Sequence, residues 1–162
     1  MRRVKLDRID RRILSDLQAN GRITNVELSR RAGISAPPCL RRVRALEEAG
    51  YIRGYHADLD AEALGFGVTV FAQVGLSSQA EQDLRAFEAL VRSWPEVREC
   101  HMLAGENDFI LKIVAKDWDA YQGFLTRELT AAPNVSHVKT SLTIRPSKQL
   151  PGVPLEQVTQ GR

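Results

Sequence analysis

The 162-residue sequence lacks the features of a membrane, secreted or disulfide-stabilised protein. No apolar run approaches the roughly 18 residues of a membrane-spanning helix. The first residues turn polar at once, so they contain no apolar signal-peptide core. The two cysteines, Cys39 and Cys100, lie far apart and form no Cys-x-x-Cys pair, which is ordinary in a reducing compartment. We therefore expect a cytoplasmic protein without a membrane partner.

The sequence also lacks the usual signatures of a catalytic or metal centre. None of the three histidines, His56, His101 and His137, has a His or Cys partner at metal-ligand spacing. The sequence contains no phosphate-binding glycine-rich loop and no Gly-x-Gly-x-x-Gly fingerprint, and no nucleophile–base pair stands out. We predict that the protein is not an enzyme, with no catalytic residues, no metal site and no cofactor.

Charge is distributed unevenly along the chain. Residues 1–56 contain 13 Lys and Arg against 6 Asp and Glu, a net charge of +7. Residues 57–162 contain 10 Lys and Arg against 14 Asp and Glu, a net charge of −4, which together give the overall +3. A basic part joined to an acidic part indicates a polyanionic partner for one part only. A solvated charged face is the alternative interpretation.

The first fifty residues have the apolar spacing of a helix-turn-helix module. Thr24 and Glu27 fit a capping box, and Gly33 lies in a tight turn. The spacing predicts three helices, over residues 7–19, 25–32 and 37–49. In this arrangement the third helix lies in the major groove of DNA. A helical unit that docks a protein instead is the alternative.

The third predicted helix carries three arginines. Three apolar residues at spacing three are expected to face the core: Leu40, Val43 and Leu46. That orientation places Arg41 and Arg42 outward, toward base edges or phosphates, and Arg44 to one side, toward a phosphate. The full set of predicted DNA-binding residues is Arg22, Ser35, Ala36, Pro38, Arg41, Arg42, Arg44 and Arg53.

Two local features flank this helix. If Ser35 is the N-cap, the amides that it would cap belong to Pro37 and Pro38 and do not exist. The Ser35 hydroxyl would then be available for a phosphate oxygen. After the helix, residues 51–57 alternate like a strand, which predicts a wing or exit strand containing Arg53.

The remainder of the chain predicts a second, α+β domain. Its patterns give strands over residues 68–76, 97–103, 109–115 and 135–144, and helices over residues 80–94 and 118–129. This strand–helix–strand–strand–helix–strand order is that of a ferredoxin-like βαββαβ fold. The predicted ranges are 1–56 for the helix-turn-helix domain, 57–67 for a linker, 68–145 for the ferredoxin-like domain and 146–162 for an extended tail.

A four-stranded sheet with helices on one face leaves its other face for water or a partner. Four residues are candidates for one side of this sheet: Phe71, Gln73, His101 and Lys112. Such a mixed face suits packing between subunits better than free exposure.

Several segments together resemble the Lrp/AsnC family of transcriptional regulators. Four lie in the N-terminal part: residues 6–14 (LDRIDRRIL), 21–28 (GRITNVEL), 38–43 (PCLRRV) and 52–55 (IRGY). Glu-Cys-His at residues 99–101 and Gly-Glu-Asn-Asp-Phe at residues 105–109 are also similar. The resemblance covers about residues 5–148, in order. Where the family often has Ser-Pro-Thr-Pro-Cys, residues 35–39 are Ser-Ala-Pro-Pro-Cys, so no operator preference is carried over.

The resemblance implies a winged helix-turn-helix domain on double-stranded DNA and a C-terminal domain that binds an amino acid, often leucine. It also implies a homodimer formed through the sheet that assembles further, commonly to an octamer. The matching positions for the effector are Met102, Gly105, Asn107, Asp108, Thr140 and Thr143. Asp108 could accept from the ammonium group, and amides near Gly105 could donate to the carboxylate. From spacing alone, an ordinary hairpin loop between two strands is the preferred interpretation of these loop residues.

The sequence therefore predicts a sequence-specific DNA-binding transcriptional regulator that responds to an amino acid. Two alternatives stay open. One is a constitutive architectural DNA-binding regulator without an effector. The other is a small-molecule-binding oligomeric module whose helical domain docks a protein.

Overall fold

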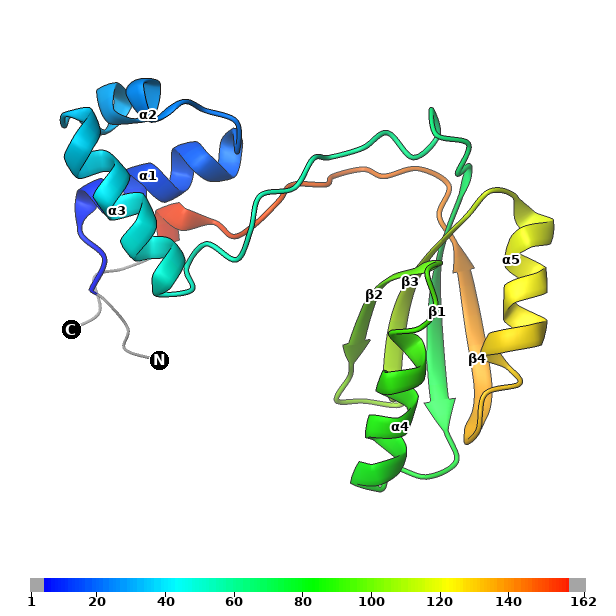
Figure 1. Cartoon of the computed structure of the whole chain (residues 1–162). Helices are drawn as coiled ribbons and strands as arrows, with labels where there is room; N and C mark the ends of the chain where they lie inside the picture. The colour runs from blue at the N-terminus through cyan, green and yellow to red at the C-terminus, as the bar shows by residue number, and fades with distance from the viewer. Residues whose placement is uncertain (1–4, 158–162) are drawn as a thin grey trace. The chain divides into compact units, whose positions relative to one another are not determined.

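The computed structural model describes residues 5–157 and divides the chain into two compact units. Among the described residues, 5–58 and 148–157 form the first unit, and Leu59–Ser147 form the second. Within residues 5–157, we find no helix with the length and apolar character of a transmembrane segment. Figure 1 shows both units.

The first unit contains the three predicted helices. They are α1 (Arg8–Ala19), α2 (Asn25–Ala32) and α3 (Ala36–Glu48) (Figure 1). Each contributes to a small core of four buried residues: Ile13, Leu28, Cys39 and Leu46. Partly buried apolar residues such as Leu14, Leu17 and Val43 pack against this core, and ion pairs between the helices add to it.

The starts of α1 and α2 are capped by side chains. At α1, Asp7 accepts from the Asp10 amide at 2.8 Å, and Asp10 accepts from the Asp7 amide at 3.1 Å, which completes a capping box. At α2, Thr24 accepts from the Glu27 amide at 3.2 Å as predicted. The Glu27 carboxylate binds two arginines instead of reaching back, so this second capping box is only half formed.

The turn between α2 and α3 depends on Gly33. Its φ of 70° and ψ of 32° are left-handed values that glycine adopts without strain. The amides of Gly33 and Ile34 donate to carbonyl groups in the last turn of α2, which ends that helix. The predicted tight turn is confirmed.

The strand expected at residues 51–57 is absent from the structure. This stretch follows α3 as an irregular segment, and Tyr55 donates its hydroxyl to Glu47 at 2.9 Å. The alternating pattern was misleading because a strand needs a neighbour with which to exchange backbone hydrogen bonds. The linker expected at residues 57–67 contains a helical turn closed by the Phe66 amide on the Ala61 carbonyl.

The second unit has the predicted βαββαβ order. Its elements are β1 (Val68–Leu76), α4 (Glu81–Val91), β2 (Val97–Met102), β3 (Phe109–Ala115), α5 (Trp118–Phe124), the π-helical turn η1 (Leu125–Leu129) and β4 (Val135–Leu142). The strands form one antiparallel sheet in the order β2-β3-β1-β4. The expected ferredoxin-like arrangement is confirmed.

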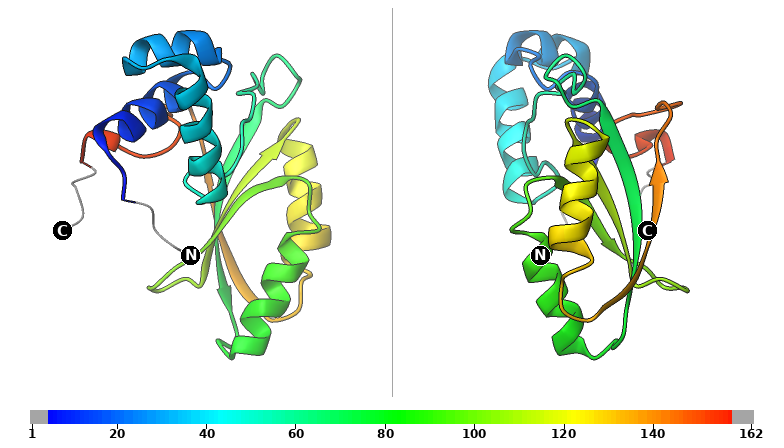
Figure 2. Two further views of the ribbon diagram at one scale, coloured as in Figure 1. Left: turned by 60° about the vertical axis from the view of Figure 1, so that its left-hand side comes forward. Right: turned by 90° about the vertical axis from the view of Figure 1, so that its right-hand side faces the viewer.

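Both long helices of this unit cover the same face of the sheet (Figure 2). Alternate β1 and β3 residues point into the core beneath them, as the period of a strand requires. Aromatic rings fill much of that core. The ring centroids of Phe87 and Phe109 lie 4.9 Å apart, and those of Trp94 and Phe124 lie 5.3 Å apart in an edge-on contact. Cys100 is partly buried against the same core.

The tail differs from the extended segment that the sequence predicts. As far as residue 157, it returns to α1 and ends in a short 3-10 helix, η2 (Leu155–Gln157), beside that helix. The Gln18 side chain exchanges two hydrogen bonds with the backbone of Val153. A three-residue helix is too short to produce apolar periodicity, so the sequence contains no signal for it. Residues 158–162 of the predicted tail lie outside the described range.

Candidate functional site: a basic helix and a loop at the sheet edge

The start of α3 has no side-chain cap. Ser35 is the N-cap residue, but its side chain makes no capping hydrogen bond, because proline occupies the first turn of the helix. This confirms that Ser35 forms no cap, as the sequence predicts, while its contact with DNA stays a prediction. Its hydroxyl is exposed beside the first turn of α3, where a phosphate oxygen is a suitable acceptor.

The exposed face of α3 is rotated from the predicted one. Cys39 is fully buried, whereas Leu40, expected to face inward, is 39% exposed. The inward face is centred on Cys39, Val43 and Leu46, a spacing of four and three residues. The outward face accordingly carries Pro37, Leu40, Arg41 and Arg44. Of the other predicted contacts on α3, Ala36 and Pro38 are half-buried.

Arg42 is held by two acids at the start of α1. Its Nη1 donates to Asp7 Oδ2 and to Asp10 Oδ1, each at 2.7 Å. These hydrogen bonds raise the pKa of Arg42. The pKa of Asp7 is lowered, first by the hydrogen bond from the Asp10 amide and then by Arg42. The geometry thus favours a positioning role, fixing α3 against α1, over the predicted contact of Arg42 with base edges.

A side-chain hydrogen bond joins the starts of α2 and α3. The Asn25 side-chain amide donates to the Ala36 carbonyl at 2.9 Å. Its Oδ1 is buried and has no hydrogen-bond partner among the described residues. Because Ser35 provides no cap, Asn25 is the side chain that holds the first turn of α3 to its neighbour.

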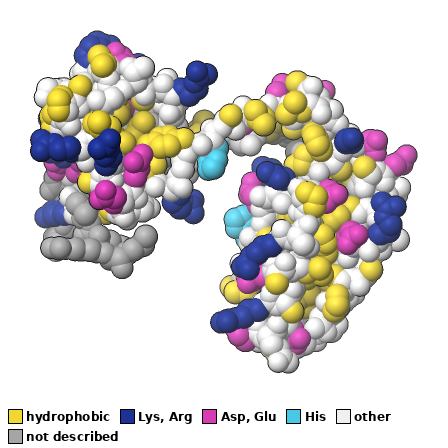
Figure 3. All heavy atoms as spheres, viewed as in Figure 1, with side chains coloured by type: hydrophobic (Ala, Val, Ile, Leu, Met, Phe, Trp, Pro, Cys, Tyr) yellow, Lys and Arg dark blue, Asp and Glu magenta, His cyan; other side chains and the backbone are white. Residues whose placement is uncertain are grey.

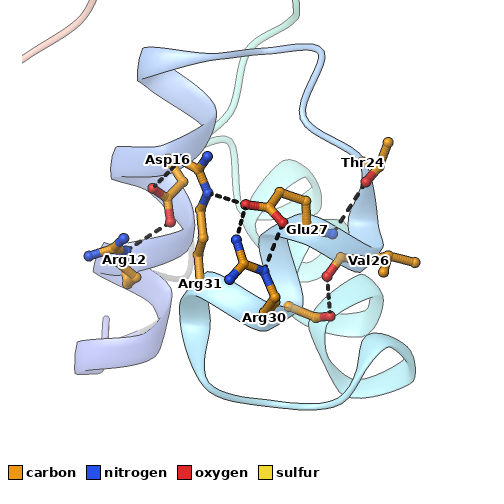
Figure 4. Close-up of polar contacts among 8 residues, drawn as sticks. Arg12, Asp16, Thr24, Val26, Glu27, Arg30 and Arg31 are labelled. Atoms are coloured by element: carbon orange, nitrogen blue, oxygen red, sulfur yellow. Dashed lines mark hydrogen bonds and ion pairs between the residues drawn. The ribbon is translucent and has the colours of Figure 1, made fainter.

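A series of ion pairs links α1 to α2 (Figure 4). Asp16 on α1 binds Arg12 at 2.8 Å and Arg31 at 3.6 Å, and Arg31 also binds Glu27 at 2.8 Å. Hydrogen bonds from Arg30 and then Arg31 lower the pKa of Glu27 to about 2. These arginines are engaged with carboxylates, whereas Arg41 and Arg44 lie exposed on another helix.

The two remaining predicted DNA contacts lie outside the helices. Arg22 is exposed between α1 and α2, where its amide donates to the Asn20 side chain at 3.0 Å. Arg53 is exposed in the irregular segment after α3. Lys and Arg side chains are prominent on the face of the first unit seen in Figure 3.

The predicted effector loop joins β2 to β3. Met102 at the end of β2 is 60% exposed, and the Gly105 backbone has open space around it. Asn107 donates to Gln73 at 3.2 Å and also pairs with the His137 ring at 3.0 Å. Met102 lies beside α4. Asn107, in contrast, belongs to a polar network on the uncovered face of the sheet.

Asp108 has a structural partner that the sequence does not reveal. Its Oδ2 accepts from the Leu76 amide at 2.6 Å, where the pairing of β1 is irregular. The Asp108 backbone also bonds to Val74 and Leu103, which closes the loop. One carboxylate oxygen is therefore already engaged before any ligand arrives.

The two predicted threonines point to opposite faces of the sheet. Thr140 lies on the helix side, with its hydroxyl 2.6 Å from the buried Tyr121 hydroxyl. Burial is the main reason that the pKa of Tyr121 is raised. Thr143 is the first residue after β4, where its amide donates to the Thr69 carbonyl, and the alternation of the strand places it on the side opposite Thr140. A single chain therefore does not gather the six predicted effector residues into one pocket.

A groove of about 450 Å³ lies between α4 and the end of β2. Met102 is the one predicted effector residue that lines it. The other lining residues combine both charge signs with one apolar side chain: Glu81, Leu84, Arg85, Glu88 and Arg92. Residues 5–157 contain no cluster of three or more potential metal ligands.

The uncovered sheet face has the mixed character that the sequence predicts. Phe71 is 37% exposed and lies directly across from Lys112, while His101 and Gln73 both pair with Ile110. Lys112 also binds Glu99 at 3.0 Å, and this hydrogen bond lowers the pKa of Glu99. All four predicted residues thus lie on the same side.

Two family models match the chain, one for each unit. A model described as winged helix-turn-helix DNA-binding matches residues 6–53. A model described as Lrp/AsnC ligand binding domain matches residues 69–153.

Proteins similar along nearly the whole chain include two named leucine-responsive regulatory protein. The one from Rhizobium meliloti is 58% identical over 146 residues, which cover 90% of this chain and 94% of that protein. The one from Escherichia coli K12 is 42% identical over 144 residues, with coverages of 89% and 88%.

Solved structures of similar proteins have the same fold. A transcriptional regulator from Neisseria meningitidis, in complex with L-Met, gives a TM-score of 0.88 at 39% identity, over 93% of this chain and 97% of that one. An AsnC family regulator from Agrobacterium tumefaciens gives a TM-score of 0.89 at 31% identity, over 95% and 100%.

Proposed function

This chain belongs to the Lrp/AsnC family of DNA-binding transcriptional regulators with an amino-acid-binding domain, and we propose how its residues divide that work. The observation that carries the proposal is the exposed face of α3, where Arg41 and Arg44 lie beside the uncapped Ser35. In a helix-turn-helix unit this face enters the major groove.

We assign Arg41 to a base edge, because it lies in the middle of the exposed face. A guanidinium can donate two parallel hydrogen bonds to guanine. Arg44, Ser35, Arg22 and Arg53 contact phosphates, which fix the register on the duplex without reading its sequence. Arg42 and Asn25 act indirectly, by holding α3 in place.

The amino acid binds at the β2–β3 loop, where a second copy of the chain completes the pocket. The scattering of Met102, Asp108 and Thr140 within one protomer supports a composite site. The Asp108 oxygen not engaged by Leu76 accepts from the ammonium group. Leucine is the first candidate ligand, because similar proteins carry that name. Methionine is the second, because the similar Neisseria meningitidis regulator was solved with L-Met.

The oligomer follows from the same fold. We infer a dimer formed by the uncovered sheet faces around Phe71 and Lys112, assembling further to an octamer. The amino acid changes DNA binding by favouring one assembly state over another, since a ligand shifts an equilibrium only by its unequal affinity for the two states. The protein acts in the cytoplasm, holds no cofactor and catalyses no reaction.

The DNA assignment is tested by fluorescence anisotropy on a duplex selected from a random pool. Arg41→Ala should weaken binding roughly 5- to 150-fold and relax the preference at one base pair, as expected for a lost bidentate contact. Arg44→Ala should weaken binding to all sequences and reduce the salt slope by about 1. Arg85→Ala on α4 is the matched control and should leave binding unchanged. Full affinity in both α3 variants would contradict the assignment.

The effector site is tested by calorimetric titration with the twenty amino acids and by light scattering of the same samples. Asp108→Asn keeps an oxygen for the Leu76 amide but removes the charge that attracts an ammonium group. Affinity for the effector should therefore fall while the fold persists, and Asp119→Asn on α5 serves as the control. If no amino acid changes heat, mass or DNA affinity, the constitutive architectural alternative is correct.

A further inference from the structure

We propose that α1 carries a docking site for the C-terminal tail of this chain, and that the docked tail is a second tether of the DNA-binding unit. The proposed function uses no residue after Thr143, yet residues from Lys148 onward belong to the first compact unit. The chain therefore leaves this unit once, after Asp58, and returns to it near its end.

The recognition residue is Gln18, near the end of α1. Its Nε2 donates to the Val153 carbonyl at 2.8 Å, and its Oε1 accepts from the Val153 amide at 3.0 Å. A primary amide that both donates to and accepts from one residue reproduces the pairing found between antiparallel strands. The site consequently recognises an extended peptide backbone, independent of the side chain at that position.

Gly152 makes the close approach possible. Its φ of 75° lies in the left-handed region, which side chains other than glycine rarely adopt. A Cβ atom at this position would also overlap the Gln18 side chain. Conformation and space thus both require glycine at the residue that precedes the double hydrogen bond.

The flanking residues favour the docked conformation. Pro151 and Pro154 limit the conformations of the undocked tail, so less entropy is lost when it docks. Leu155, the first residue of η2, is half-buried, whereas residues 151–154 are exposed. The tail therefore ends with an apolar contact as well as a polar one.

The occupant of the site is the tail of the same chain, and its described residues, 148–157, leave the DNA-binding face clear. Arg41 and Arg44 are exposed on α3 with the tail in place on α1. Docking therefore does not compete with DNA. Instead, it adds a second connection between the unit that binds DNA and the unit that assembles. A unit held by two connections has fewer orientations to lose when a dimer binds two half-sites.

The docking itself is tested by hydrogen exchange of the full-length protein, followed by mass spectrometry. Gln18→Ala and Gly152→Val should each speed exchange in the peptide that contains the Val153 amide about tenfold, the effect of one or two lost hydrogen bonds. Gln122→Ala, an exposed glutamine on α5, is the matched control. Exchange in the wild-type peptide as fast as in both variants would overturn the docking site.

The tether is tested on operator DNA with the same three variants, and this step rests on the proposed DNA-binding function. Gln18→Ala and Gly152→Val should weaken binding several-fold while the melting temperature of the free protein changes little. Unchanged DNA affinity in variants whose tail exchanges faster would overturn the tether. Failure of the wild-type protein to bind any DNA would instead reject the proposed function, and the exchange result would stand without it.

Discussion

The two units of this protein are stabilised in different ways. The first unit has four fully buried apolar residues and joins its helices by charged contacts, such as Arg42 with Asp7 and Asp10. The second unit buries fifteen residues between its sheet and its helices, including five aromatic side chains and a tryptophan–phenylalanine contact. A basic surface suits DNA, but some arginines of this unit, such as Arg42, are paired with carboxylates of another helix. Electrostatic interactions therefore contribute to folding as well as to DNA binding.

The difference predicts separate responses to mutation, acid and salt. Both tryptophans, Trp94 and Trp118, belong to the second unit, so tryptophan fluorescence reports on that unit alone. Helical circular dichroism includes the first unit, whose ordered structure is mainly helical. The two signals together can therefore distinguish the units in one unfolding experiment.

The largest expected effect is in the apolar core of the second unit. Phe109→Ala should lower the free energy of unfolding by about 3–5 kcal/mol, because a fully buried ring leaves a cavity. Urea unfolding followed by tryptophan fluorescence measures it, and Phe66→Ala, at a half-exposed ring before β1, should cost far less. An equal shift of the fluorescence and dichroism transitions would show that the two units unfold together.

The second-largest expected effect is the loss of stability when the ion pairs of Arg42 in the first unit are removed. Arg42→Met retains the aliphatic stem but leaves Asp7 and Asp10 without their cation, so we expect a loss of about 1–2 kcal/mol. Circular dichroism at increasing urea measures this loss. The matched control, Arg41→Met, should stay within about 0.5 kcal/mol of the wild type. Equal stability of the two variants would remove Arg42 from its positioning role.

The two N-cap residues of the helix-turn-helix should behave differently. Thr24→Ala removes an observed capping bond and should cost about 1 kcal/mol. Ser35→Ala removes no capping bond, so it should leave stability nearly unchanged and weaken DNA binding. Thermal melting and anisotropy on the same samples separate these outcomes. A parallel loss of stability and affinity in Ser35→Ala would show that its hydroxyl supports the fold.

The smallest effect is the acid response of Glu27. Its pKa falls from an ordinary value of 4.5 to about 2 in the folded state, through hydrogen bonds from Arg30 and Arg31. Because the folded-state pKa is the lower one, this stabilisation is present above about pH 4.5 and is lost as the pH falls toward 2. When the melting temperature, followed by circular dichroism, is plotted against pH, Glu27→Gln should give a smaller slope over that pH range. An identical slope in wild type and variant would disprove the contribution of Glu27.

Much of the fold could be predicted from local sequence signals. Strand and helix periodicity gave the order of the second unit, and the two prolines after Ser35 predicted its uncapped hydroxyl. These features depend on neighbours within a few residues. The alternation at residues 51–57 has the same local form, but no strand is available there for pairing.

The rest depends on contacts between distant parts of the sequence. Arg42 looks like a DNA contact until its partner Asp7, 35 residues earlier, is placed beside it. Asp108 is predicted only as a ligand group, and its second role, accepting from the Leu76 amide on another strand, appears only in the folded chain. The orientation of α3 was misjudged because cysteine is often fully buried, and Cys39 takes the inward position that Leu40 was expected to hold.

Each unit also contains one cysteine in or against its core. Cys39 is fully buried in the first core, and Cys100 is half-buried against the second. Burial raises the pKa of both thiols, that of Cys100 to about 11, so neither is a reactive thiolate at neutral pH. An alkylating reagent would modify each thiol when its own surroundings open. The rates of modification at the two cysteines would therefore time the opening of the two units separately, in unlabelled protein and in a single sample.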